Sequence, residues 1–320
     1  MQSTFWIWTQ VIFFGSTTTL SGWQSSSSVS SRSAAEPIEL TTRNLSQYLP
    51  GLHSKNSRQS YIVKQPVVLT SLAEQWTLNN LEFQAGGVLY IGATKLQLDI
   101  RGVLIAPPGK TTIFSSFVKR EADSGNSGSG GPGAGGRGTD GGNGQDGQSS
   151  GVLTLQLHAL PSRAFRIALF GQSGGHGGNG GPGSPGANGQ KGRPGESGPF
   201  GCNRGGDNGS SGAPGGDGGN PGSGGSCGAG GLVTVIVPEA LESRIQRMIE
   251  IDDASAMPGS PGDPGAPGAG GRGGDGGDGN GFCGGGRPGA SGPPGRPGVL
   301  ISVNRAPCAP PSIQIIAIPQ

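Results

Sequence analysis

Four cysteines are the residues whose type and spacing most clearly imply chemistry in this 320-residue chain. The interval from Cys202 to Cys227 equals the interval from Cys283 to Cys308. No Cys-x-x-Cys pair or neighbouring His indicates zinc, so we expect disulfides, which persist in oxidising compartments. The equal intervals favour Cys202–Cys227 and Cys283–Cys308 bridges, and the sequence alone leaves the other two connectivities open.

Motifs that would support phosphate or calcium binding are incomplete. The run 108–111, Pro-Gly-Lys-Thr, ends like a phosphate-binding loop but lacks the first Gly of that motif and its βαβ context. The runs 135–140 and 270–275 match the start of a calcium-binding nonapeptide, yet Gly142 and Gly277 stand where a large aliphatic residue is required. We therefore interpret the aspartates in these runs as solvated loop residues.

Carboxylates and histidines that could serve catalysis are not grouped. Asp252 and Asp253 are adjacent, and adjacent strand residues point to opposite faces. His53, His158 and His176 are isolated from one another and from any candidate nucleophile. We predict no enzyme, no metal and no cofactor.

Four bulky side chains interrupt the bare glycine segments: Phe200, Asn203, Arg204 and Phe282. Because they are bulky side chains among bare glycines, at the expected turns and tips of the bundles, these residues are our candidates for ligand recognition. The competing interpretation is that each fills a turn or packs locally.

Glycine recurs at every third position through most of three blocks, which comprise residues 125–147, 171–231 and 259–298. A period of three matches polyproline II, in which glycine leaves one edge of the helix free to pack against another backbone. Runs such as 258–268 alternate Gly with Pro and could be collagen, whereas Gly-Gly-X runs such as 174–181 have two bare edges and suit the inside of a bundle. Ser197 is placed in an outer helix.

The glycine register also predicts where the chain reverses. It slips at Ala134, near Arg204 and at Pro221, whereas Asn280 and Cys283 occupy glycine positions without changing the phase. We interpret the slips as turns between helices.

Apolar residues with period two indicate strands around the glycine blocks. The alternating residues are Leu153, Leu155 and Leu157; Phe165, Ile167 and Leu169; Val233, Val235 and Val237; and Val299, Ile301 and Val303. Short apolar runs between residues 76 and 106 are similar. The run 239–249 also fits a helical face, and we expect a short helical turn leading into a strand. Because 160–166 and 241–247 share Leu-x-Ser-Arg-x-x-Arg, an internal repeat is plausible.

Composition and termini suggest an exported protein without one large apolar core. The chain has 68 glycines, 26 prolines and 5% aromatic residues, and its net charge of +2 is scattered without a cationic stripe, which argues against a nucleic-acid partner. The apolar run 5–14 suits a signal peptide but is too short to span a membrane, although no Lys or Arg precedes it.

The Gly-x-y blocks resemble bacterial collagen-like proteins. The mixture of Gly-Gly-X runs, register breaks and cysteines looks more like polyglycine II bundle proteins, namely springtail antifreeze proteins and the adhesins at the tips of T-even-type phage tail fibres. These resemblances imply, respectively, surface or matrix structure, ice binding, and receptor recognition through loops at a bundle tip. The chain departs from all three by carrying β segments between its glycine blocks, so no functional residue is transferred.

The predicted fold class is mostly β plus polyproline II or polyglycine II, with a β-helix or sandwich-like scaffold and inserted glycine-rich helical bundles. We divide the chain into a signal peptide (1–22), a Ser-rich linker and irregular segment (23–60), a β scaffold (61–124), glycine block 1 (125–147), a β segment (148–170), glycine block 2 (171–231), a β segment (232–258), glycine block 3 (259–298) and a C-terminal β segment and tail (299–320).

The predicted function is that of a secreted or cell-surface, non-enzymatic structural or adhesive protein. Its partner would be a surface, matrix or carbohydrate ligand, self-association is compatible with the sequence, and the mature chain would not be an integral membrane protein. The alternatives are a trimeric collagen-like rod, an ice-binding protein and a β-helix carbohydrate-active enzyme, of which the last would need clustered carboxylates.

Overall fold

The computed structural model describes residues 38–45, 47, 52, 59–70, 72–300 and 305–319. The predicted signal peptide, most of the predicted linker, His53, Ile301 and Val303 lie outside the described residues. The strands are β1 (Ile38–Glu39), β2 (Tyr61–Val63), β3 (Val67–Val68), β4 (Ala73–Leu78), β5 (Leu81–Phe83), β6 (Leu89–Tyr90), β7 (Lys95–Ile100), β8 (Leu104–Ile105), β9 (Thr112–Ser115), β10 (Val152–Leu157), β11 (Phe165–Ala168), β12 (Glu196–Gly198), β13 (Gly201–Arg204), β14 (Leu232–Pro238), β15 (Ile249–Ile251) and β16 (Ser312–Ile318). A 3-10 turn, η1 (Glu239–Leu241), leads into the helix α2 (Glu242–Met248).

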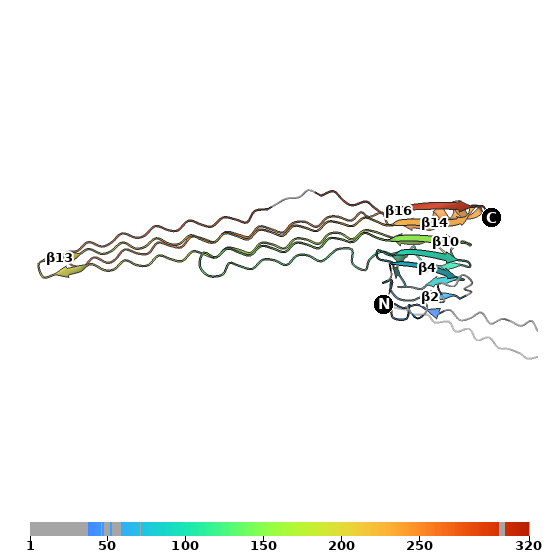
Figure 1. Ribbon diagram of the computed structural model, residues 1–320, viewed down its shortest axis with the longest axis horizontal. Coiled ribbons are helices and arrows are strands. Elements are labelled where there is room, and N and C mark those ends of the chain that lie inside the picture. The colour runs from blue at the N-terminus through green and yellow to red at the C-terminus, as the bar shows by residue number, and fades with distance from the viewer. Residues whose placement is uncertain are drawn as a thin grey trace, which may run out of the picture. The chain divides into compact units, whose positions relative to one another are not determined.

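Three parallel sheets organise the fold (Figure 1). Sheet A has the order β1-β2-β5-β8, sheet B the order β15-β11-β9-β6-β3, and sheet C the order β16-β14-β10-β7-β4. Consecutive strands from β2 to β10 visit sheets A, B and C in turn, so the chain coils and each strand pairs with its equivalent from the next turn. The pairs Leu153↔Leu96 and Leu153↔Val233 illustrate the register in sheet C.

The core lies between the three sheets and is built from the inward residues of the alternating strands. In β10, Leu153, Leu155 and Leu157 are buried while the residues between them are half-buried, as the period-two pattern predicts. The ring of Phe114 meets the rings of Phe83 and Phe165 edge-on, with centroid distances of 5.3 Å and 6.5 Å. One aromatic cluster therefore joins sheets A and B. Burying aromatic side chains removes about 150–250 Å² each from water, which is a large apolar contribution to stability.

The glycine blocks are three excursions from this coil. Block 1 connects β9 to β10, block 2 connects β11 to β14, and block 3 connects β15 to β16. Their extended segments lie side by side and are joined by backbone hydrogen bonds, such as Gly177 N to Ser260 O at 2.8 Å and Gly219 N to Gly181 O at 2.8 Å (Figure 1). We call residues 125–147, 171–231 and 259–298 together the glycine array.

Glycine is required in the array because neighbouring backbones approach too closely for a side chain. A Cβ at Gly177 would lie 2.1 Å from the Gly222 carbonyl oxygen, and a Cβ at Gly178 would lie 2.0 Å from the Asn126 carbonyl oxygen. Both distances are far below van der Waals contact. In this Gly-Gly-X run, consecutive glycines therefore face two different neighbouring segments, and His176, at the X position, is exposed.

The fold class predicted from the sequence is wrong. The prediction combined a β-helix or sandwich-like scaffold with inserted polyproline II or polyglycine II helical bundles. The described chain instead forms four sheets, parallel in every strand pair except β12–β13, and its glycine blocks contain no assigned helix. A glycine period of three records only that every third residue meets a neighbouring backbone, and extended hydrogen-bonded segments satisfy that condition as well.

Three local predictions are also corrected. Val299 is exposed and in no strand, and the C-terminal strand is β16 instead. Ser197 is in β12, where its Oγ donates a hydrogen bond to the Asn280 carbonyl, so it is not in an outer helix. Pro221 lies within a continuous segment, since Gly219 and Gly222 donate to Gly181 and Gly178 in succession. The phase slip there marks no reversal.

The expected helical turn before a strand is confirmed by η1, α2 and β15. The two copies of Leu-x-Ser-Arg-x-x-Arg nevertheless fold differently. Residues 241–247 form α2 and its entry, whereas the equivalent residues of 160–166 form a loop and the start of β11. The strand register pairs Phe165 with Ile249, whereas the motif alignment would place Phe165 opposite Gln246. The second copy therefore contains extra residues, which accommodate α2.

Candidate recognition site

The predicted recognition residues meet at two turns of the glycine array, which we call the tip and define as residues 196–204 and 280–284. β12 and β13 form an antiparallel hairpin in which Gly198 pairs with Gly201, leaving Pro199 and Phe200 as the turn. Proline fixes φ and is favoured in turns, which explains the reversal at this point. The second turn is closed by an antiparallel bridge between Asn280 and Cys283.

A disulfide fixes these two turns to each other. Cys202 of β13 is bonded to Cys283, with 4.9 Å between the Cα atoms. The Ser197 hydroxyl donates to the Asn280 carbonyl across the same junction. The tip is therefore crosslinked between segments that are 81 residues apart in the chain.

The aromatic side chains at the tip face solvent. Phe200 is 101% exposed and Phe282 is 76% exposed. Asn203 and Arg204 are exposed on β13, and Arg204 Nη2 lies 3.4 Å from Glu196 Oε1. Both rings are largely uncovered, and both residues lie within turns, as the turn-filling interpretation also requires. The arrangement offers apolar rings beside amide and guanidinium donors.

The presence of disulfides is confirmed, but the predicted pairing is wrong. The bridges are Cys202–Cys283 and Cys227–Cys308, each with a sequence separation of 81. They link equivalent points on successive excursions, rather than closing short loops within one excursion. The sequence did contain an indication of this pairing, because the two copies of the Leu-x-Ser-Arg motif are separated by the same number of residues as the cysteines of each bridge. Disulfides on this pattern are consistent with an extracellular location.

Polar side chains at the X positions of the glycine array form a ladder that sequence reasoning missed. Asp140 Oδ1 accepts the backbone N–H of Asn220 at 2.8 Å, and Asp146 Oδ1 accepts that of Ser226 at 2.6 Å. The backbone N–H of Ser226 lowers the pKa of the Asp146 carboxyl. Arg137 also lies 2.9 Å from Asp140. Asp140 lies in one of the incomplete calcium motifs, and its carboxylate therefore accepts a hydrogen bond from a backbone N–H group. Equivalent bonds join Asn143 to Ser223, Asn179 to Asp263, Asn188 to Arg272, Asn208 to Arg287 and Asp217 to Arg296.

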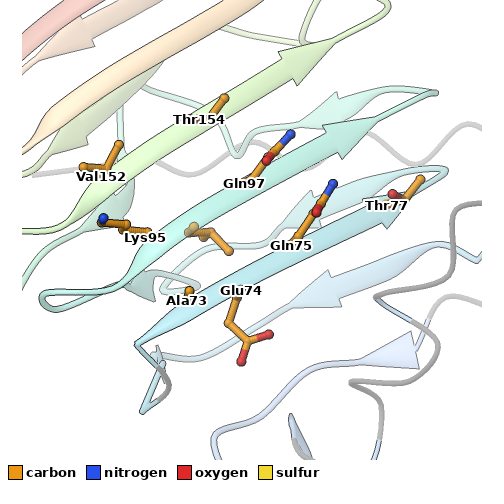
Figure 2. A pocket seen from close by; sticks show the side chains of 9 residues that line it. Ala73, Glu74, Gln75, Thr77, Lys95, Gln97, Val152 and Thr154 are labelled. Atoms are coloured by element: carbon orange, nitrogen blue, oxygen red, sulfur yellow. The ribbon is translucent and has the colours of Figure 1, made fainter.

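A shallow groove on the outer face of sheet C is a second surface that the sequence did not reveal (Figure 2). Gln75, Gln97 and Thr154 are paired across β4, β7 and β10, and they line a cavity of about 560 Å³. Figure 2 shows the two Gln side chains lying side by side. The row offers amide and hydroxyl groups for hydrogen bonding. Its residues come from distant parts of the chain, and only their outward positions in period-two strands could have indicated it.

The remaining sequence candidates are not brought together. His158 Nε2 lies 2.8 Å from Asp99, and His176 lies 2.7 Å from Ser260 Oγ. Asp252 is paired with Arg120 at 2.7 Å. Across the described ranges, no three His, Cys, Asp or Glu side chains are grouped so that they could hold a metal ion. None of the helices in the described part of the chain has the length and apolar character needed to span a membrane.

Comparison with known proteins gives no relative: no protein-family model, no curated protein and no solved structure matches the chain.

Proposed function

We propose that this protein is an exported, non-enzymatic adhesive protein whose tip binds a surface, matrix or carbohydrate ligand. The observation that carries the proposal is the exposure of Phe200 and Phe282 on a disulfide-linked tip. Exposed aromatic rings gain apolar burial when a partner covers them, and Phe and Arg are enriched at protein interfaces. The Cys202–Cys283 bridge limits the conformational entropy that the tip would lose on binding.

The sheets and the glycine array have structural roles in this proposal. The core of sheets A to C supplies apolar burial, and the array carries the chain from the sheet strands to the tip and back. Its backbone N–H groups donate within the same chain, as Gly222 does to Gly178 at 2.8 Å. This internal pairing favours the adhesive proposal over a collagen-like trimer, in which those donors would have to serve other chains.

A binding screen with matched variants tests the proposal. The labelled full chain would be applied to a printed glycan array and to immobilised fibronectin and collagen. We expect binding to at least one of these probes, lost in Phe200→Ser/Phe282→Ser. Val118→Ser is the control, because Val118 is 69% exposed but lies outside the tip. Failure of the wild type to bind any probe, or binding that the double variant retains, would contradict the proposal.

A further inference from the structure

β16 is an open edge of sheet C. It pairs with β14 along its whole length, from Leu232↔Ser312 to Pro238↔Ile318, and no described strand pairs with its other side. Its sequence, SIQIIAI, contains no charged residue. Natural edge strands are usually protected by charges, by bulges or by a covering segment, because an exposed ladder of backbone groups pairs readily with another strand. β16 has no charge and its register with β14 has no bulge; α2 contacts it, but no described backbone group pairs with its outer side.

The direction of the free backbone groups follows from the ladder. Ser312 N donates to Gly231 O at 3.0 Å, so the backbone of Ser312 faces β14. Backbone groups alternate in direction along a strand, and hence those of Ile313, Ile315 and Ala317 face away from β14. No backbone hydrogen bond to the outward groups of these three residues is present in the described part of the chain.

The side chains at this edge are only partly covered. Ile313 is 40% exposed, and Ile316 and Ile318 on the other face are 37% and 36% exposed. By contrast, Leu40 and Leu52, from the N-terminal part of the described chain, are fully buried in the core cluster. The β16 end therefore has apolar side chains on both faces beside unpaired backbone groups.

We propose that β16 pairs antiparallel with β16 of a second copy of this chain, about a two-fold axis at Ile315. With that register Ile315 faces its own equivalent, and Ile313 faces the equivalent of Ala317. All three have outward backbone groups, so each facing pair exchanges both N–H···O bonds. The strand thus matches itself in hydrogen bonds and in apolar character, and no charge is desolvated. A two-fold pairing is closed at this interface, because the β16 edge of each copy is paired with that of the other.

The proposed register can be tested by placing like or opposite charges across the interface between the two copies. On the outer face Gln314 lies opposite Ile316 of the other copy, and both are exposed in the single chain. We expect sedimentation equilibrium to show that the wild-type full chain is a dimer. Gln314→Lys/Ile316→Lys places like charges directly opposite each other twice, which should raise the dissociation constant about tenfold or more. Gln314→Glu/Ile316→Glu should do the same, and an equimolar mixture of the two variants should recover a dimer.

Gln75→Lys/Gln97→Lys is the matched control, because both residues are exposed on the outer face of sheet C away from β16. It should leave the dimer unchanged. Recovery in the mixture separates charge repulsion from loss of folding. A monomeric wild type at micromolar concentration, species larger than a dimer, or a lysine variant that dimerises as the wild type does would overturn the proposal. So would a mixture that stays monomeric.

Discussion

Gly177→Val is the substitution that most directly probes close packing in the glycine array. The new Cβ would lie 2.1 Å from the Gly222 carbonyl oxygen and 2.6 Å from its carbon, so the two segments must separate. Gly222 takes part in two backbone hydrogen bonds at this contact: its N–H donates to Gly178 O at 2.8 Å, and its carbonyl accepts the N–H of Gly262 at 3.0 Å. Unmaking a buried hydrogen bond costs about 1–3 kcal/mol, so losing both would reduce the free energy of unfolding by roughly 2–6 kcal/mol.

Differential scanning calorimetry of the full chain measures this loss. For a chain of this size, we expect the melting temperature to fall by at least about 3 °C. Ala187→Val is the matched control, because Ala187 is an exposed non-glycine residue of the same segment and its substitution adds the same kind of side chain to solvent. Equal melting temperatures for the two variants would refute the close approach of segments in the array.

Two further predictions concern the disulfides and acid stability. Peptide mapping without reductant should join the fragment containing Cys202 to the fragment containing Cys283, and a Cys202–Cys227 fragment would show that the excursions are not aligned as described. Although burial opposes it, the hydrogen bond from Arg120 and the backbone N–H of Ala254 hold the pKa of the Asp252 carboxyl below its ordinary value of 3.8. A depressed folded-state pKa stabilises the fold above the ordinary value, so this stability should be lost as the pH falls below about 4. Melting temperature measured against pH should therefore decline less steeply below that point in Asp252→Asn, and parallel curves would contradict the assignment.

Strand positions were the part of the fold that the sequence predicted well. Alternation at Leu153, Leu155 and Leu157 arises because one face of β10 is buried, and a period of two is the direct consequence of that burial. Alternation does not say which strands pair. Each pair of neighbouring strands in sheet C is separated along the chain by strands of other sheets, and only the coil geometry sets that order.

Turns in the glycine array were predicted less well, for a physical reason. The chain reverses at 280–283 although the glycine phase continues there, and it does not reverse at Pro221 although the phase slips. The position of a glycine in the three-residue repeat indicates which neighbouring segment that glycine faces. The glycines that donate to residues 293 and 296 end with Gly218, whereas those that donate to Gly181 and Gly178 continue through Gly219 and Gly222, so the phase changes without a turn.

The candidate site was predictable in composition but not in its assembly. Phe200 and Phe282 stand out among glycines, yet nothing in their local sequence indicates that one disulfide would hold their turns together. The equal short intervals between cysteines led to the wrong predicted pairing. The observed bridges depend instead on how successive excursions align with each other. The polar ladder was missed because Asn and Asp in glycine-rich runs also fit solvated loops.

Equilibrium binding to a probe from the screen tests the adhesive proposal most directly. The dissociation constant would be measured for the wild-type chain and for Phe200→Ser/Phe282→Ser on the same immobilised probe. If both rings are central contacts worth about 2 kcal/mol or more together, the dissociation constant should rise by about thirtyfold or more. A dissociation constant within twofold of the wild-type value would show that the tip does not carry recognition.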